Sequence, residues 1–238
     1  MQTICAHTCS NANNLIIQNV SDKLPLQPDF QQLRREYTQG SLNKRNTAIN
    51  PLDQFRLWYA QALSAGIEEP NAMTLATVGD DQKPSARMVL LKDIDPAGFV
   101  FYTNFNSRKG VQMQQNPFAA LIFFWPALER QVRIEGAIAR IDDHLASAYF
   151  QQRPRDSQVS AIISPQSQSI PSRKYLEELR DHFLTSHAGE QLQRPVNWGG
   201  YIVLPRRIEF WQGRLSRLHD RIQYLLIDDV WQKERLAP

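Results

Sequence analysis

The chain of 238 residues carries 27 lysines and arginines against 24 aspartates and glutamates, a formal net charge of +3. This balance does not favour nucleic-acid or membrane binding through bulk charge, so an anion site must come from local clustering. With 42% hydrophobic residues, and no apolar run near the roughly 20 residues of a membrane span, the sequence predicts a globular protein with a sizeable core.

The first 28 residues are polar and have no apolar segment behind basic residues, so a secretory signal is not predicted. They contain Cys5, His7 and Cys9, a C-x-H-x-C pattern without a fourth metal ligand nearby. Two reduced thiols are the simpler interpretation, which favours a cytoplasmic protein without a metal site. We therefore expect a flexible extension over residues 1–28 and one domain over residues 29–238.

A short basic helical stretch is predicted over residues 30–37. A second helix begins at Pro51 behind an Asn50 cap and ends before Gly66. Its apolar residues recur at helical spacing, which predicts a face turned to the core. Residues 73–78 then form a strand, followed by a turn over residues 79–84.

Residues 85–110 combine strands with cations. A strand over residues 88–91, with Arg87 and Lys92 at its ends, and a strand over residues 99–103 predict a hairpin. Ser107 then caps a helix with Arg108 and Lys109 in its first turn, where backbone N–H groups attract anions. The pattern suggests a binding site for a phosphorylated ligand. The alternative is an ordinary amphipathic hairpin with solvated charges.

The remaining chain alternates between strands and helices, which predicts an α+β fold: an antiparallel split β-barrel with surrounding helices. Nucleotide sites of the G-x-G-x-x-G or P-loop type are not supported. The predicted strands are residues 118–125 (a buried strand), 130–141, 199–204, 207–211, 218–227 and 230–236. The predicted helices are residues 143–152, a short helix that begins at Asp156 or Ser157, and a helix capped by Ser172 that runs through residue 184.

Tyr149 and Arg153 share one helical face, and Ser157 lies at the next helix start. These donors suit a phosphate monoester. The alternative is an Arg-Pro-Arg loop paired with Asp156.

Three cationic or titratable residues alternate near the end of the chain. If residues 217–221 are extended, Arg217, His219 and Arg221 project to one face, and the guanidiniums lower the proton affinity of the imidazole. This arrangement favours a functional positive wall. An edge strand kept soluble by its charges is the alternative.

An ordered set of motifs resembles the pyridoxamine 5′-phosphate oxidase family over residues 31–238. The motifs are RMVLLK (87–92), FYTN-x-x-SRKG (101–110), ERQVR-x-EG (129–136), YF-x-x-RPRDSQ (149–158), QS (166–167), W-G-G (198–200), IEFWQG (208–213), RLHDR-x-x-Y (217–224) and ERLAP (234–238).

The resemblance implies a split-barrel homodimer that binds FMN between its subunits, and the composition adds the expectation of no nucleic-acid, membrane or metal partner. It implies an enzyme of pyridoxine metabolism that oxidises pyridoxamine or pyridoxine 5′-phosphate to pyridoxal 5′-phosphate, with O2 giving hydrogen peroxide and the amine giving ammonia. FMN would be held by Arg87, Met88, Val89, Leu90, Leu91, Lys92, Tyr102, Thr103, Arg108, Lys109, Gln131, Gln166, Ser167, Trp211 and Arg221. The substrate would be held by Lys92, Tyr149, Arg153, Ser157 and Leu218, by the catalytic Arg217 and His219, and by Arg34 and Tyr37 of a mobile N-terminal segment.

Two alternative functions stay open at this point. Another FMN split-barrel oxidoreductase would share the flavin positions but has no need of Tyr149, Arg153, Ser157 or the RLHDR motif. A non-catalytic protein that binds a flavin or pyridoxal phosphate could use the same barrel.

Overall fold

The computed structural model describes residues 35–238. By its internal contacts the chain divides into Met1–Glu36 and one compact unit, Tyr37–Pro238. Cys5, His7, Cys9 and Arg34 lie outside the described residues, and the boundary at residue 28 stays a prediction. Residues 35–38 form no helix, so the helical stretch over residues 30–37 is wrong for its described end.

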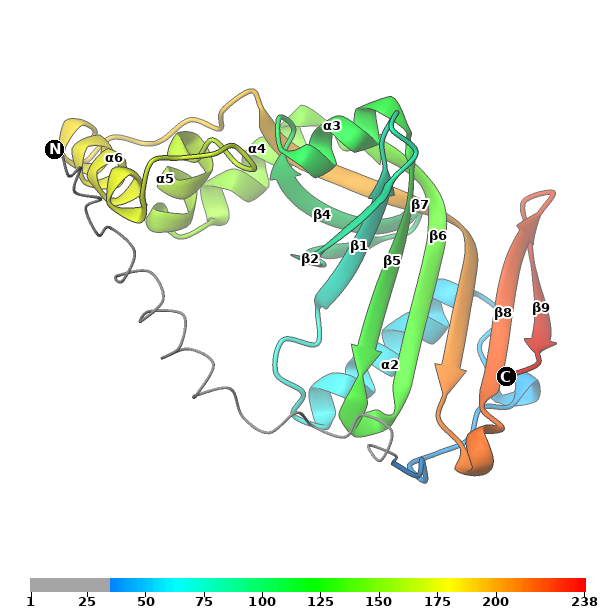
Figure 1. The fold of residues 1–238 in the computed structure, drawn as a ribbon. Coiled ribbons are helices and arrows are strands. Elements are labelled where there is room, and N and C mark those ends of the chain that lie inside the picture. Colours follow the sequence, from blue (N-terminus) through cyan, green and yellow to red (C-terminus); the bar gives the residue numbers. More distant parts are fainter. Residues whose placement is uncertain (1–34) are drawn as a thin grey trace, which may run out of the picture. The chain divides into compact units, whose positions relative to one another are not determined.

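Within residues 35–238, nine strands form one antiparallel sheet that curls into a half-barrel (Figure 1). The order β2-β1-β5-β6-β7-β4-β3 is extended by β8, which pairs with β7, and by β9, which pairs with β8. The strands are β1 (Ala72–Val78), β2 (Pro84–Leu90), β3 (Asp93–Asp95), β4 (Gly98–Asn104), β5 (Phe118–Trp125), β6 (Arg130–Arg140), β7 (Trp198–Gln212), β8 (Asp220–Ile227) and β9 (Val230–Leu236).

The helices follow the predicted pattern closely. They are α2 (Pro51–Ser64), α3 (Arg108–Gln115), α4 (Asp143–Gln152), α5 (Arg155–Ile163) and α6 (Arg173–Ser186), with short 3-10 turns η1 (Lys44–Asn46), η2 (Pro126–Leu128) and η3 (Leu215–Arg217). The Asn50 side chain accepts a hydrogen bond from the N–H of Leu52, which confirms the predicted cap of α2. Phe55 of α2 is fully buried, and its ring contacts Phe99 and Phe123 at centroid distances of 4.9 and 4.8 Å. Helix α2 thereby fills the core of the half-barrel.

The predicted hairpin between residues 88–91 and 99–103 is wrong. Strand β2 pairs with β1, with Thr74 opposite Met88, whereas β4 pairs with β3 and β7. The short hairpin is β3–β4, closed at Asp95 and Gly98. The reason is that β2 and β4 lie near opposite ends of the strand order, and each pairs with the strand that precedes it in the sequence, β1 and β3.

Strand β7 runs unbroken through both strands predicted over residues 199–211. Its register against β6 shifts between Glu135 and Gly136, opposite Pro205. A bulge of this kind bends the strand without ending it, which allows one long strand to contact β6, β4 and β8.

Strand β5 is only half-buried, so the predicted buried strand is corrected. Leu121, Phe123 and Trp125 are in the core, but Phe118 and Phe124 are 57% and 55% exposed. The two rings alternate with the core residues and therefore lie on the outer face of the sheet.

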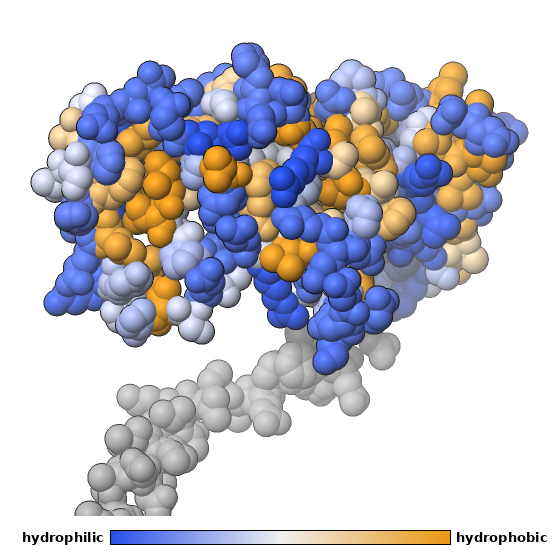
Figure 2. Space-filling view, turned by 90° about the horizontal axis from the view of Figure 1, so that it is seen from above, coloured by the Kyte–Doolittle hydropathy of each residue, from blue (hydrophilic) through white to orange (hydrophobic). Residues whose placement is uncertain are grey.

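Helices α4 and α5 pack beside the sheet around a second core of Phe150, Val159, Leu192 and Trp198. Figure 2 shows the molecule from above, a face that is mostly hydrophilic with apolar side chains in separate groups. In residues 35–238 no helix combines the length and the apolar character required to cross a membrane.

Substitution of Gly136 by alanine should destabilise the fold. A Cβ atom at this position would lie 2.0 Å from the carbonyl oxygen of Leu204, so β6 or β7 has to move. We expect Gly136→Ala to lower the free energy of unfolding by about 1–3 kcal/mol in a urea titration. Gly40→Ala is the matched control, because its nearest contact is a side-chain atom, Oε1 of Gln212, at 3.3 Å and not a backbone atom at 2.0 Å. An unchanged free energy of unfolding in Gly136→Ala would contradict this reading of the bulge.

Candidate functional site

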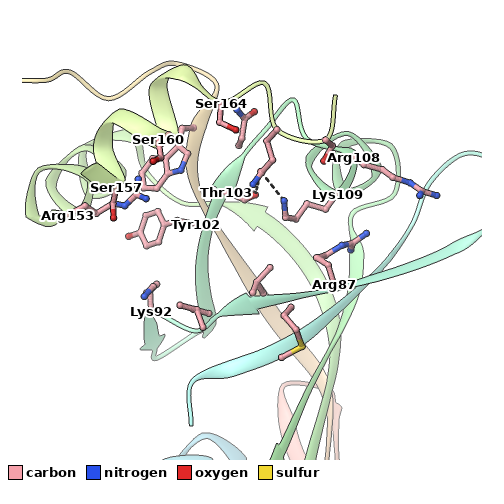
Figure 3. Close-up of a pocket in the computed structure, with 18 of the residues that line it drawn as sticks. Arg87, Lys92, Tyr102, Thr103, Arg108, Lys109, Arg153, Ser157, Ser160 and Ser164 are labelled. Atoms are coloured by element: carbon pink, nitrogen blue, oxygen red, sulfur yellow. Dashed lines mark hydrogen bonds between the residues drawn. The ribbon is translucent and has the colours of Figure 1, made fainter. Parts of the chain in front are cut away.

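A cavity of about 830 Å³ lies between β2, β4 and the helices α3 to α5. Figure 3 shows Arg87, Arg108 and Lys109 at one side of it and Arg153, Ser157 and Lys92 at the other, with Thr103 between. The cavity gathers fourteen of the predicted site residues: Arg87, Met88, Val89, Leu90, Lys92, Tyr102, Thr103, Arg108, Lys109, Tyr149, Arg153, Ser157, Gln166 and Ser167.

The first side is the N-terminus of α3. Ser107 caps the helix by accepting a hydrogen bond from the N–H of Gly110, as predicted. Lys109 is only 9% exposed and donates from Nζ to Ser107 Oγ at 3.1 Å and to Gln166 Oε1 at 3.0 Å. Gln166 Oε1 also accepts from Thr103 Oγ1 at 3.3 Å. The loop around Gln166 is thereby tied to the helix start.

Neutral acceptors hold Arg87 beside this helix. Its guanidinium donates to the carbonyl oxygen of Leu75, to the side-chain oxygens of Thr77 and Ser85, and to Gln112 Oε1. Burial, and then the nearby Arg108, lower the pKa of Arg87. Among residues 35–238 no aspartate or glutamate forms an ion pair with Arg87, Arg108 or Lys109, so a bound anion can neutralise the cluster.

Burial and the nearby Arg87 also lower the pKa of Lys109, to about 8. The lysine therefore titrates close to physiological pH, and an anion that binds here favours its protonated form.

Arg153 is central to the other side of the cavity. Its guanidinium lies over the Trp198 ring, with Cζ 4.7 Å from the centroid, and its Nη1 is buried without a hydrogen-bond partner. Burial lowers the pKa of Arg153. The alternative pairing with Asp156 is not found in the described residues: Arg155 instead donates to the carbonyl oxygens of Glu190 and His187. Arg153 also lines the cavity, and a guanidinium there that forms no ion pair in the described residues is a candidate binding group for an oxyanion.

Three aromatic rings stack beside Arg153. Tyr102 stacks on Tyr149 at 4.0 Å and on Trp198 at 5.3 Å between centroids. Burial raises the pKa of both tyrosines, so their hydroxyls stay protonated donors at neutral pH. Tyr149 and Arg153 approach the cavity from one helix end, as their spacing predicts.

Sequence reasoning missed several residues of the cavity. Ser160 and Ser164 follow Ser157 at helical spacing along α5 and its end, so this periodicity could have found them. Trp198 belongs to the W-G-G motif, but no local pattern gave it a role. Ser85 and Asn104 also line the cavity without a signal in the sequence.

Other predicted site residues lie elsewhere. Leu91 is 6% exposed and packs in the core. Gln131, Trp211 and Arg221 are register neighbours on β6, β7 and β8. Arg217 and Leu218 lie at the η3 turn, at the opposite end of the sheet from α3 to α5 (Figure 1).

The rings of Tyr37, Trp211 and His219 form a cluster near this turn. Centroid distances are 5.6 Å for Tyr37–Trp211, 5.6 Å for Tyr37–His219 and 4.6 Å for Trp211–His219. The backbone N–H of Arg214 donates to His219 Nδ1 at 3.2 Å, so the neutral ring carries its proton on Nε2. Burial and then Arg217 lower the pKa of His219, which keeps the ring neutral at pH 7.

The extended stretch predicted over residues 217–221 is wrong. Ser216 and Arg217 have φ values of +53° and +59°, and β8 begins only at Asp220. Left-handed backbone at two successive residues cannot continue a strand. Arg217 therefore leaves the row that would have aligned it with His219 and Arg221.

The residues of the cavity fit a phosphorylated cofactor and a phosphorylated substrate. Five cations line it, and among the described residues none of the lining side chains is an aspartate or glutamate. The cations lie at two separate sides (Figure 3), and the unpartnered Arg153 Nη1 belongs to one of them. Two phosphates and an aromatic ring system therefore match the donors present.

Two family models match the chain. Residues 59–178 match the model described as pyridoxamine 5′-phosphate oxidase. Residues 198–238 match the one described as the pyridoxine 5′-phosphate oxidase C-terminal dimerisation region.

Curated relatives match along nearly their whole length. The pyridoxine/pyridoxamine 5′-phosphate oxidase of Synechocystis is 50% identical over 206 residues, 87% of this chain and 96% of the relative. The protein of the same name from Gloeothece citriformis is 52% identical over 207 residues, 87% of this chain and 97% of the relative.

Solved structures share the fold. PhzG from Burkholderia lata, in complex with tetrahydrophenazine-1-carboxylic acid, aligns with a TM-score of 0.78 and 27% identity over 82% of this chain and 95% of that chain. A pyridoxamine 5′-phosphate oxidase-related, FMN-binding protein from Nostoc punctiforme aligns with a TM-score of 0.63 and 19% identity over 77% of this chain and 97% of that chain. The predicted antiparallel split barrel is confirmed.

Lys109 should make the stability of the ligand-free protein depend on pH. Its pKa in the fold, about 8, lies below the ordinary value of 10.5, so between these values the unfolded chain binds more protons. Stability should therefore rise with pH in this window, by at most about 1.4 kcal/mol per pH unit. We expect Lys109→Met to remove this part of the slope in urea titrations from pH 7 to 10. Lys83→Met, which removes an exposed lysine, should keep it. Identical slopes for Lys109→Met and the unsubstituted protein would contradict the assignment.

Proposed function

Because the chain belongs to the pyridoxamine 5′-phosphate oxidase family, and is thus an FMN-dependent oxidoreductase of vitamin B6 metabolism, we propose which of its residues perform the reaction. Pyridoxamine and pyridoxine 5′-phosphates are oxidised to pyridoxal 5′-phosphate. The observation that carries the residue assignments is the single cavity with cations on two sides.

The FMN phosphate is assigned to the side formed by Arg87, Arg108 and Lys109. Three cations and the first N–H groups of α3 offer both charge and hydrogen bonds to a dianion. Thr103, Gln166 and Ser167 complete this side, and Met88 to Leu90 and Tyr102 extend along the cavity toward the other.

The substrate phosphate is assigned to Lys92, Tyr149, Arg153 and Ser157. These side chains bring two positive charges and two hydroxyl donors to one place. Holding the phosphate there fixes the distance between the reacting carbon of the substrate and the flavin, which is a positioning effect.

A homodimer completes the site. Residues 198–238, which match the dimerisation region, include Trp211, Arg217, His219 and Arg221. In one chain these residues are remote from the cavity, so the second subunit would supply them. The outer face of the sheet supports such an interface, because Met88, Phe118 and Phe124 are more than half exposed there.

The bound flavin would supply the two-electron acceptor for C4′ of the substrate. Arg217 would orient the pyridine ring and stabilise charge that develops on the substrate. His219, neutral with its proton on Nε2, can donate a hydrogen bond to the same ring. Tyr37, packed against both Trp211 and His219, would close this part of the site, and Arg34 is assigned to the same covering segment.

O2 is the proposed final acceptor, which gives hydrogen peroxide, and water releases ammonia from the amine substrate. We also propose a cytoplasmic location, without a nucleic-acid or membrane partner, since the small net charge favours neither.

A direct assay separates this function from its rivals. The purified chain should bind FMN, and pyridoxine 5′-phosphate under air should give peroxide and the aldehyde. A flavin-loaded protein that is inert to both substrates but reduced by another donor would indicate a different FMN oxidoreductase. Inertness to every donor would indicate a binding protein, and failure to bind FMN would overturn the proposal.

Arg153→Ala should raise KM for pyridoxine 5′-phosphate about tenfold or more, because a charge-assisted contact to the phosphate is lost in ground and transition states alike. The FMN affinity should stay unchanged. Arg155→Ala is the matched control, since its guanidinium bonds to backbone carbonyls instead of lining the cavity. Steady-state kinetics and FMN titration check both, and a normal KM in Arg153→Ala would remove the phosphate assignment.

Arg217→Ala should lower kcat about a hundredfold while FMN remains bound, because the side chain is proposed to act on the substrate ring and not on the cofactor. Arg206→Ala removes an exposed arginine of β7 and serves as the control. Turnover at the unsubstituted rate in Arg217→Ala would refute its catalytic role.

A further inference from the structure

Glu209 is a buried carboxylate on the outer face of the sheet, with only 3% of the residue exposed. It lies on β7 two residues before Trp211, opposite Arg133 on β6 and Gln223 on β8. Its Oε2 accepts a hydrogen bond from Arg133 Nη2 at 2.7 Å. Its position is therefore in the middle of the strands that carry Gln131, Trp211 and Arg221.

Both oxygens of the Glu209 carboxylate accept hydrogen bonds from Arg221. Arg221 Nε donates to Oε1 at 2.7 Å and Nη2 donates to Oε2 at 3.1 Å, a bidentate pair. Arg221 Nη1 donates to the carbonyl oxygen of Ala237 at 2.8 Å. These three bonds fix the plane of the guanidinium and leave two of its five N–H groups for another partner.

Stability alone is a weak reason for this arrangement. A buried ion pair gains little over apolar residues of similar volume, because desolvation offsets its attraction. A fixed guanidinium, by contrast, loses less side-chain entropy when it binds a ligand, and it presents its free N–H groups in one orientation.

We propose that Glu209 is the positioning residue for Arg221 in the FMN site. This inference rests on the proposed function, in which Arg221 contacts FMN. Among the described residues the hydrogen-bond partners of the Glu209 side chain are Arg133 and Arg221, neither of which lines the cavity, so Glu209 would act through the orientation of the Arg221 side chain.

A double-mutant cycle on the full chain, freed of FMN, tests the inference. The dissociation constant of FMN is measured by flavin fluorescence for Glu209→Gln, Arg221→Gln and the double variant. We expect each single change to raise the dissociation constant about tenfold or more, and the double variant to lie within twofold of Arg221→Gln. Losses that multiply in the double variant would overturn the inference, since Glu209 would then act independently of Arg221.

Glu135→Gln is the matched control. Glu135 also pairs with Arg133, at 3.1 Å, but it makes no contact with Arg221. FMN affinity within twofold of the unsubstituted chain is expected. A loss in Glu135→Gln as large as in Glu209→Gln would indicate a general effect of charge on this face and overturn the inference.

The same variants distinguish a failure of the Glu209 proposal from a failure of the assignment of Arg221 to the FMN site. Unchanged affinity in Arg221→Gln would contradict the assignment of Arg221 to FMN. Weakened affinity in Arg221→Gln with normal affinity in Glu209→Gln would overturn only the role of Glu209.

If Glu209→Gln does not fold, Glu209→Asp replaces it. Aspartate keeps the charge beside Arg133 but is one methylene too short to hold Arg221 in the same place. We expect at least a threefold loss of FMN affinity, and unchanged affinity would overturn the inference.

Discussion

The site depends on keeping like charges together without carboxylates. Arg87, Arg108 and Lys109 repel one another, and partial burial makes this repulsion stronger than at an open surface. Carbonyl, hydroxyl and amide oxygens hold Arg87 and Lys109 in place. Such acceptors orient a cation without neutralising it, so the net charge is preserved for a ligand. The cavity is therefore strained electrostatically when empty and relaxed when an anion binds, a common trade of stability for function.

The sheet determines how these charges are distributed. Strand β7 pairs with β6 and β4, and further along with β8, so one strand passes from the cavity to the cluster around His219. The bulge at Gly136 allows this length without a break. On the proposed assignment, a single chain carries two incomplete halves of a site, and a second subunit that packs on the exposed rings of Phe118 and Phe124 would join them.

Local signals in the sequence predicted local structure well. Asn50, Ser107 and Ser172 cap helices as expected, and Tyr149, Arg153 and Ser157 meet in one cavity as their spacing indicates. The pairing of the strands could not be predicted from the sequence. Nothing in residues 88–103 indicates that β2 pairs with β1 and β4 with β7, because turn residues identify where a strand ends and not which strand it joins. The left-handed backbone at Ser216 and Arg217 carries no glycine to signal it.

The free edges of the sheet limit how copies of the chain can associate. Strand β3 has only three residues, β9 carries Lys233, Glu234 and Arg235, and the edge strand β2 begins with Pro84 and carries Arg87. Short or charged edges resist the addition of a strand from another molecule. When two copies pack through their outer faces about a twofold axis, in contrast, the same face of each copy is buried and none is left for a third copy. The architecture therefore favours a closed pair over open-ended fibres, even at the high concentrations of a crowded cell.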